Sequence, residues 1–156
     1  MDQIKWCLNQ KKGIELVEPS DNLRDAYLVK AEDALDTLKT SKSRDWQLTT
    51  AYYTIYNSIY SLLMKIGIKC EIHSCTIEFT KRYLKDHFTP EDFELIDKAF
   101  SARIDSQYYV NRQVPDQNYD FITKKTPAFL VKCKNIVLDQ KEIIEIRARV
   151  SSVRSV

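Results

Sequence analysis

The chain has 156 residues, of which 44% are hydrophobic and 29% are charged, so its composition fits one globular domain with a real core and excludes a disordered chain. It has only 2 Gly and 4 Pro, which favours long helices over a many-stranded β fold with frequent turns. The 24 basic and 22 acidic side chains leave a net charge of +2, without the large positive excess of a dedicated nucleic-acid binder. This balance is compatible with a local basic patch.

The four cysteines, Cys7, Cys70, Cys75 and Cys133, include no Cys-x-x-Cys pair. The N-terminus lacks a basic segment followed by an apolar stretch, and no apolar run approaches the length of a membrane span. We therefore expect a cytoplasmic protein with no membrane association, in a reducing compartment where the cysteines are free thiols.

A possible metal site lies in the segment 70–75, which gathers Cys70, His73 and Cys75. Zinc takes four ligands, however, and the sequence has no second ligand pair. Free thiols near a helix start are the simpler interpretation, so we predict no metal and no cofactor.

Residues 1–19 are predicted to be an N-terminal lead-in that lies over the rest of the protein. A first helix is predicted over 23–39, because its apolar residues recur at spacings of three and four and form one buried stripe. Ser20 or Asp21 precedes it, and either side chain can accept a hydrogen bond from the free amides of the first turn.

The second predicted helix spans 45–66, with Ser43 as its cap and Gly67 at its end, where a left-handed residue is wanted. Apolar and aromatic side chains surround its axis, which indicates a central helix, or one that faces the core on one side and a partner chain on the other. Its four tyrosines either pack in the core, as we expect for at least half of them, or stack on bases or a partner. They are Tyr52, Tyr53, Tyr56 and Tyr60.

A third helix is predicted over 74–86 with Ser74 as its cap. The start of the fourth is the clearest in the chain. Thr89 caps it, Pro90 takes the first helical position, and the two acidic residues that follow favour the positive helix end. This helix should end near Tyr109.

Residues 111–118 form a predicted polar loop, and a last helix is predicted over 126–149 with Pro127 near its start. Residues 151–156 are expected to be a frayed tail. Helices joined by short loops favour antiparallel neighbours. The sequence therefore predicts an all-α protein, an antiparallel up-and-down bundle of about five helices over residues 20–150.

Four segments resemble the HEPN superfamily, and most of all its stand-alone archaeal and bacterial proteins. They are Lys30-Ala31-Glu32-Asp33-Ala34-Leu35 in the first helix, Ala51-Tyr52-Tyr53 continuing through Tyr56 and Leu62-Leu63 to Gly67 in the second, His73-Ser74 at the third, and Arg103-Ile104-Asp105-Ser106-Gln107-Tyr108 in the fourth. Their order and distances fit the family over most of the chain. The set is specific for the fold and much less so for activity.

The resemblance implies a dimeric bundle of four or five helices. Many HEPN proteins are metal-independent ribonucleases, often toxins, and their partners are frequently small nucleotidyltransferases that act as antitoxins. Other members have lost the catalytic residues and serve as binding or structural parts. In some pairs the transferase adds adenylate to a tyrosine beside the motif, which the resemblance places at Tyr108 or Tyr109. The plainer interpretation is two ordinary half-buried tyrosines.

Active members use an arginine, four to six residues and then a histidine, because cleavage without a metal needs an imidazole to move protons and a guanidinium to hold the charge on phosphorus. With Arg103 as the arginine, the histidine positions hold Tyr108, Tyr109 and Val110. Tyrosine, with a pKa of about 10, is a poor base at neutral pH. No histidine follows Arg112 either, so the sequence argues against the usual ribonuclease activity.

The two histidines of the chain, His73 and His87, both precede Arg103. If the third and fourth helices are antiparallel, His73 lies level with Asp105, within about one helical turn of Arg103 and Tyr108. We therefore predict a polar cluster of these four residues, with Arg103, His73 and Tyr108 as catalytic candidates. The alternative is that His73 helps to cap the third helix and Arg103 pairs with a nearby acid.

Asp105, Tyr109 and Arg112 are the candidate binding residues. The last helix has a basic bias, which is usual for a solvated face and would attract RNA if it converged with Arg103. The sequence favours a homodimeric binding module for RNA or a nucleotide, paired with a small nucleotidyltransferase. The alternatives are a divergent metal-independent ribonuclease that uses Arg103 with His73 or a tyrosine, and a helical interaction protein without a nucleic-acid role.

Overall fold

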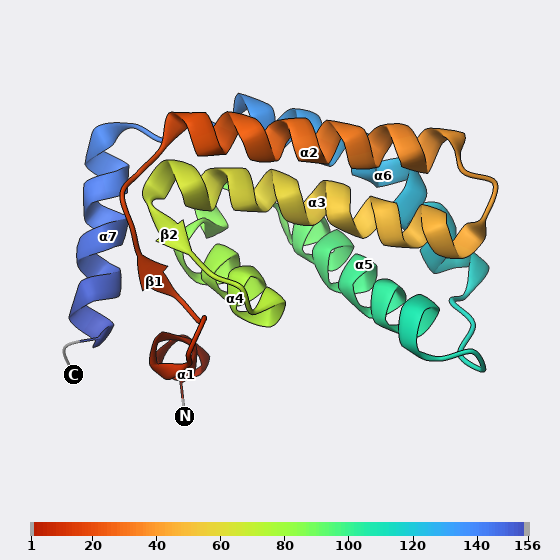
Figure 1. The fold of residues 1–156 in the computed structure, drawn as a ribbon, viewed down its shortest axis with the longest axis horizontal. Coiled ribbons are helices and arrows are strands. Elements are labelled where there is room, and N and C mark those ends of the chain that lie inside the picture. Colours follow the sequence, from red (N-terminus) through yellow and green to blue (C-terminus); the bar gives the residue numbers. More distant parts are fainter. Residues whose placement is uncertain (1, 155–156) are drawn as a thin grey trace.

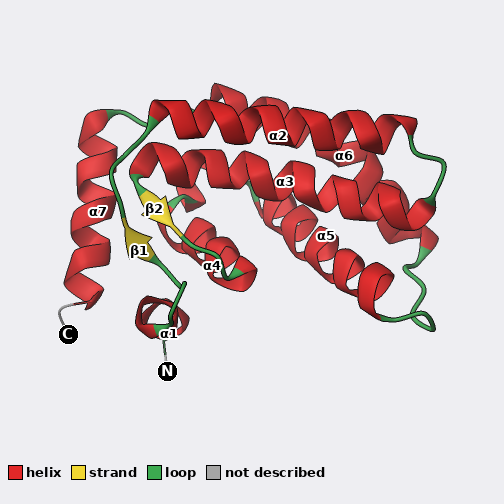
Figure 2. Ribbon diagram, in the orientation of Figure 1, coloured by secondary structure: helices red, strands yellow, loops and turns green. Residues whose placement is uncertain are grey.

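The computed structural model describes residues 2–154, and the protein is all-α apart from one short sheet, which confirms the predicted fold class (Figure 1, Figure 2). The helices are α1 (Gln3–Asn9), α2 (Asp21–Thr40), α3 (Arg44–Ile66), α4 (His73–Tyr83), α5 (Pro90–Tyr108), α6 (Asp116–Asn135) and α7 (Gln140–Arg154), with a 3-10 turn at Lys85–His87. The strands β1 (Glu15–Leu16) and β2 (Ile68–Lys69) pair antiparallel, with Glu15 opposite Lys69.

Helix α3 is the centre of the fold. It packs against α2, α5 and α6, and it also contacts α4 and α7. Its buried side chains surround the axis, as the sequence predicted for a central helix. Tyr52, Tyr56 and Tyr60 are buried and Tyr53 is half-buried, so core packing is confirmed for three of the four tyrosines.

Three predicted helix starts and one helix end have the expected chemistry. Ser20, Ser43 and Thr89 each accept a hydrogen bond from a backbone N–H in the first turn of α2, α3 and α5, and Thr89 forms a reciprocal capping box with Asp92. Gly67 ends α3 with a φ of 88°, and its N–H closes the last turn. These local signals set the starts of α2, α3 and α5 and the end of α3.

Helix α4 begins differently from the prediction. Its first residue is His73, and Ile72 stands at the N-cap position without a side-chain hydrogen bond, so Ser74 lies inside the helix and is not its cap. The amides of Cys75 and Thr76 bond instead to the Ile72 carbonyl. Backbone geometry therefore sets this helix start, and places His73 at the tip of α4.

The single last helix predicted over 126–149 is wrong, because the structure has two helices there. Helix α6 begins at Asp116, inside the predicted loop 111–118, and carries Pro127 in its interior. The chain leaves this helix at Ile136, where the backbone is extended. The apolar residues on both sides of the break keep a helical spacing, so the pattern alone concealed it.

Helix α7 has its own start signal, since the Asp139 carboxylate accepts a hydrogen bond from the Glu142 amide. It extends to Arg154, so the segment 151–154 is helical and is not the frayed tail that the sequence predicted. Positions 155–156 of that tail lie outside the described residues.

The N-terminal lead-in is folded onto the rest of the chain. Helix α1 packs against α4, and Cys7 forms a disulfide with Cys75 in the first turn of α4. This corrects the expectation that all four cysteines are free thiols, and it removes that argument for a reducing compartment. Cys70 and Cys133 are free and buried. None of the described helices is long and apolar enough to cross a membrane.

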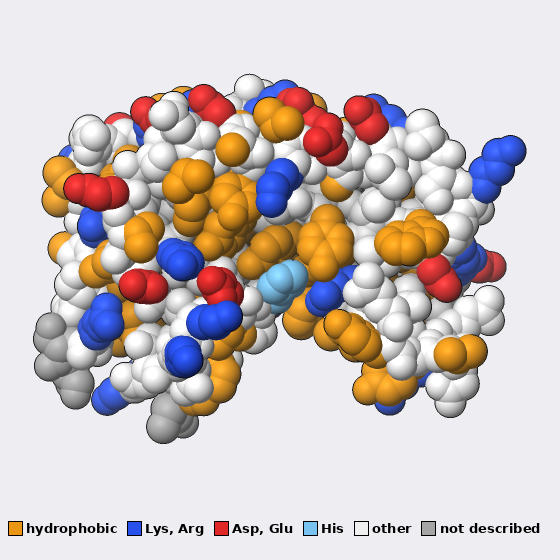
Figure 3. Space-filling view, viewed as in Figure 1, with side chains coloured by type: hydrophobic (Ala, Val, Ile, Leu, Met, Phe, Trp, Pro, Cys, Tyr) orange, Lys and Arg blue, Asp and Glu red, His pale blue; other side chains and the backbone are white. Residues whose placement is uncertain are grey.

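The helices fall into two groups. Figure 1 shows α2, α3, α5 and α6 as a bundle, with α1, α4, α7 and the sheet gathered at one end, so the bundle has four long helices and not five. Helices α4 and α5 diverge beneath α3 and make little contact with each other (Figure 1). In the space-filling view a hollow opens between them, and hydrophobic side chains gather over α3 above it (Figure 3).

Candidate functional site

His73, at the tip of α4, lies against the middle of α3. Its ring stacks on Tyr56 with centroids 4.1 Å apart and planes 15° apart, and its Nδ1 lies 2.8 Å from the Tyr52 hydroxyl. Burial and, to a smaller extent, the Arg103 charge lower the pKa of His73 from its ordinary value of 6.5. The imidazole is therefore neutral at pH 7.

The Tyr52 hydroxyl determines which nitrogen of His73 carries the proton. Burial raises the pKa of Tyr52, so this phenol stays protonated. Its hydroxyl has no other acceptor among residues 2–154, so donation to Nδ1 is the arrangement that satisfies this proton. A neutral imidazole that accepts at Nδ1 carries its proton on Nε2. In this tautomer His73 offers a hydrogen-bond donor at Nε2.

Arg103 reaches the same place from α5. Its Nη2 donates to the Tyr53 hydroxyl over 3.3 Å, and its Cζ lies 5.3 Å from the centre of the Tyr52 ring. No carboxylate within residues 2–154 forms an ion pair with it, and its buried Nε has no hydrogen-bond partner there. The alternative that Arg103 pairs with a nearby acid is therefore wrong. A guanidinium with unused donors among tyrosines suits a forked anion such as a phosphate.

The predicted cluster forms in part. His73 and Arg103 both contact Tyr52 and Tyr53 of α3, and the centre of the Tyr108 ring lies 6.0 Å from the Arg103 Cζ. Asp105 does not join them, because its carboxylate lies 3.6 Å from Nη1 of Arg112. The expected side-by-side packing of α4 and α5 is wrong as well. His73 and Arg103 reach the same two tyrosines because α3 contacts both α4 and α5.

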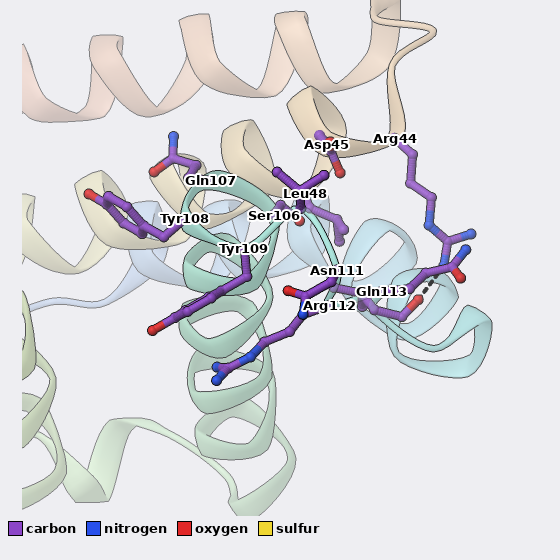
Figure 4. Close-up of a pocket in the computed structure, with 12 residues that line it drawn as sticks. Arg44, Asp45, Leu48, Ser106, Gln107, Tyr108, Tyr109, Asn111, Arg112 and Gln113 are labelled. Atoms are coloured by element: carbon purple, nitrogen blue, oxygen red, sulfur yellow. Dashed lines mark hydrogen bonds between the residues drawn. The ribbon is translucent and has the colours of Figure 1, made fainter.

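Tyr109 and Arg112 line a separate pocket of about 490 Å³ at the end of α5. The Arg112 Cζ lies 3.7 Å from the centre of the Tyr109 ring, and Figure 4 shows the two side chains extending side by side. Arg44 also lines this pocket and donates to the Val114 carbonyl. The candidate binding residues Asp105, Tyr109 and Arg112 thus form a second group, held together by the Asp105–Arg112 ion pair and the stacking of Arg112 on Tyr109. This group does not include His73 or Arg103.

Sequence reasoning missed the roles of Tyr52 and Tyr53. It placed tyrosines of the second helix in the core, which is right for Tyr52, yet the hydroxyl of each faces a functional side chain. The adjacent pair in Ala51-Tyr52-Tyr53 was the available signal, because neighbours on a helix point about 100° apart and can address two partners.

The other charged and metal-binding candidates do not extend the site. The amines of Lys125, Lys132 and Lys134 on α6 form ion pairs with acidic residues of α5 and α2. The Cys75 thiol is consumed by the disulfide, and the described part of the chain has no group of three or more His, Cys, Asp or Glu side chains that could hold a metal ion.

No known family model matches this sequence. A curated protein of Methanocaldococcus jannaschii, "Putative toxin MJ0142", is 24% identical to it over 113 residues, which make up 71% of this chain and 77% of that protein. The chain is thus similar to that protein over most of both sequences.

Proposed function

We propose that this chain is a toxin–antitoxin-type helical protein that binds RNA or a nucleotide by its phosphate, at the site of Arg103 and His73. The observation that carries the proposal is the Arg103 guanidinium, which is half-buried, has unused donors and has no acidic partner among the described residues. The similarity to a protein named as a toxin supports this biological setting, and the HEPN resemblance supports RNA or a nucleotide as the ligand.

Binding is favoured over cleavage by the state of His73. In the tautomer with Nε2–H, His73 and the Arg103 guanidinium both present donors beside the same two tyrosines, which suits the oxygens of a phosphate. A neutral imidazole that is protonated on Nε2 is not a general base at that nitrogen. The site therefore supports a binding module first and a ribonuclease second.

The partners of this module are proposed from the resemblance. A small nucleotidyltransferase would act as the antitoxin, and a second copy of the chain would complete a homodimer. Tyr108 and Tyr109 are both exposed, so either can be reached by a transferase. Co-expression and co-purification with a small nucleotidyltransferase, followed by mass spectrometry for adenylated tyrosine, test the pairing. Light scattering of the purified chain tests the homodimer.

The first experiment is a binding titration. A fluorescein-labelled single-stranded RNA is titrated with wild type, Arg103→Ala and Arg103→Lys, and anisotropy is measured at one fixed salt concentration. We expect Arg103→Ala to lower the affinity about tenfold or more, because a charge-assisted contact of about 1.5–3 kcal/mol is lost. Arg103→Lys keeps the charge but loses the forked donors, so its affinity should be intermediate.

The matched control is Arg24→Ala, which removes a partly exposed arginine that is paired with Asp25 on α2. It should bind RNA as the wild type does. Equal affinities for wild type, Arg103→Ala and Arg24→Ala would show that Arg103 is not the phosphate site.

A second candidate function is a metal-independent ribonuclease, which the closeness of an imidazole and a guanidinium favours. Incubation of RNA with the metal-free protein, its Arg103→Ala form and its His73→Ala form tests it. Cleavage by wild type that both variants abolish would establish the enzyme. Binding without cleavage by wild type would leave the binding module alone.

A further inference from the structure

Two large aromatic side chains stand in solvent beside the Arg103 site. Trp46 on α3 is 61% exposed and Tyr108 at the end of α5 is 66% exposed. Both line a pocket of about 500 Å³ together with Asp45, Thr49 and residues 106–107. Two such rings at one pocket expose a large apolar area to water when no ligand is bound. Exposed apolar patches of this kind often mark binding sites.

Helices α3 and α5 contribute residues both to this pocket and to the phosphate site. Trp46 and Tyr53 are seven residues apart on α3, so they share a helix face and their Cα atoms are on the order of 10 Å apart. Tyr53 accepts the hydrogen bond from Arg103, and the Tyr108 ring lies 6.0 Å from the Arg103 Cζ. On α5, Gln107 follows Arg103 by four residues, on the same face.

The polar atoms of the pocket suit the edge of a planar ring. Ser106 has a buried hydroxyl without a hydrogen-bond partner among the described residues, so a donor there is unused. Gln107 supplies an amide with both donors and an acceptor, and Asp45 supplies acceptors only. Aromatic faces with hydrogen-bonding groups beside them are the means by which proteins hold unstacked bases.

We propose that Trp46 and Tyr108 form a nucleobase subsite, which takes the base of the nucleotide whose phosphate Arg103 binds. This inference rests on the proposed function, because it names how the ligand of the same site is recognised. The base stacks on the aromatic faces, and Ser106, Gln107 and Asp45 contact its edge. The phosphate at Arg103 and the base at Trp46 are then held by residues of the same two helices, α3 and α5.

Fluorescence can report on this subsite directly, because the chain has two tryptophans, Trp6 and Trp46. In the Trp6→Phe variant all tryptophan emission comes from Trp46. This variant is titrated with adenosine 5′-monophosphate and, separately, with ribose 5-phosphate, which has the phosphate and the sugar but no base. We expect the nucleotide to quench Trp46 and to bind about tenfold or more tightly than ribose 5-phosphate, because only the nucleotide stacks.

Calorimetry with Trp46→Ala, and with Trp6→Ala as its matched control, completes the test. Trp6 is also partly exposed but lies on α1, so Trp6→Ala should keep the wild-type affinity for the nucleotide. Trp46→Ala should bind the nucleotide no better than ribose 5-phosphate. If ribose 5-phosphate and the nucleotide bind wild type equally, and Trp46→Ala changes neither, the base subsite is wrong while the phosphate site stands.

The Arg103→Ala variant separates this inference from the proposed function. Adenosine, which has no phosphate, should still quench Trp46 in the Trp6→Phe, Arg103→Ala double variant. If adenosine quenches and Arg103→Ala does not weaken the nucleotide, the subsite exists and the phosphate site fails. If no probe changes the emission of Trp46 or binds wild type, both proposals fail.

Discussion

The positive charge of Arg103 disfavours the protonated form of His73, and this makes the site sensitive to pH. The pKa of His73 is lowered from 6.5 by burial first and by Arg103 second. In the unfolded chain the same imidazole has its ordinary pKa. Below pH 6.5 the unfolded state therefore takes up a proton before the folded state does.

From this sign we expect the contribution of neutral His73 to stability to be fully present above pH 6.5, and to be lost as the pH falls through the folded-state pKa. Arg103→Gln removes the repelling charge, so the pKa of His73 should rise toward 6.5 and the loss should become smaller. NMR titration of the imidazole Cε1–H signal measures this shift, and the Arg24→Gln variant serves as the control. An unchanged pKa of His73 in Arg103→Gln would contradict the electrostatic coupling.

For single residues, the sequence identified Arg103 and His73 as candidates but not the tyrosines that both of them contact. Arg103 was marked by the HEPN resemblance, and His73 by its distance from the turn before α5. The spacing could not reveal that Tyr52 and Tyr53 join them, because hydroxyl contacts depend on how α4 and α5 cross α3. Asp105 was misplaced for the same reason, since the predicted antiparallel packing of those helices does not occur.

Among the elements, the C-terminal end of α3 shows how a helix end is completed from elsewhere in the chain. The Gly67 N–H bonds to the carbonyls of Leu63 and Met64, as a glycine at this position should. The Arg147 guanidinium on α7 then donates to the carbonyls of Ile66 and Gly67, and also to that of Val17. One half-buried cation thus connects three segments at the negative end of α3.

We expect Arg147→Ala to lower the free energy of unfolding by about 2 kcal/mol, because hydrogen bonds from a charged group are lost and three carbonyls lose a donor. Urea titration followed by circular dichroism measures this change. Lys141→Ala, which removes an exposed cation from the same helix, is the matched control and should stay within about 0.5 kcal/mol of wild type. A loss for Lys141→Ala as large as that for Arg147→Ala would show that α7 contributes only through its general charge.

The helices themselves were predictable where a capping residue coincided with the start of an apolar stripe, as at Ser20, Ser43 and Thr89. The break between α6 and α7 was not, because the apolar residues around Ile136 keep a helical period through it. The weak signal there was Asp139, whose side chain caps α7. Polarity patterns report which face is buried, but they do not report whether the backbone stays helical between two stripes.

In the whole molecule, the disulfide joins two helices of the end group, α1 and α4. Cys7 and Cys75 are 68 residues apart, and the loop that they close contains both α2 and α3. The sequence did not predict this bond, because two cysteines so distant meet only when β1 and β2 pair and bring α1 onto α4. The bond lies two residues after His73, so it also fixes the tip of α4 at the site.

We expect the Cys7→Ala, Cys75→Ala double variant to lose about 4 kcal/mol of unfolding free energy, from the chain entropy that this loop regains in the unfolded state. Denaturant titration of wild type with and without a reductant should give the same difference. The reductant should not change the unfolding free energy of the double variant, and this is the control for effects of the reductant other than cleavage of the disulfide. An equal stability of oxidised wild type and the double variant would show that the folded N-terminal segment needs no crosslink.

The disulfide has a mechanical consequence. Tension applied between the two termini passes through the sulfur–sulfur bond, and the chain that contains α2 and α3 carries none of it. The chain from one cysteine to the other, a separation of 68 residues, would span roughly 230 Å when fully extended. The oxidised protein cannot be stretched by this length, because the disulfide bypasses that part of the chain. A force applied at the C-terminus would unfold α7, α6, α5 and most of α4. Unfolding would then stop at Cys75, where the disulfide closes the loop that contains α2 and α3. The oxidised and reduced proteins should therefore differ in contour length even where their folded shapes agree.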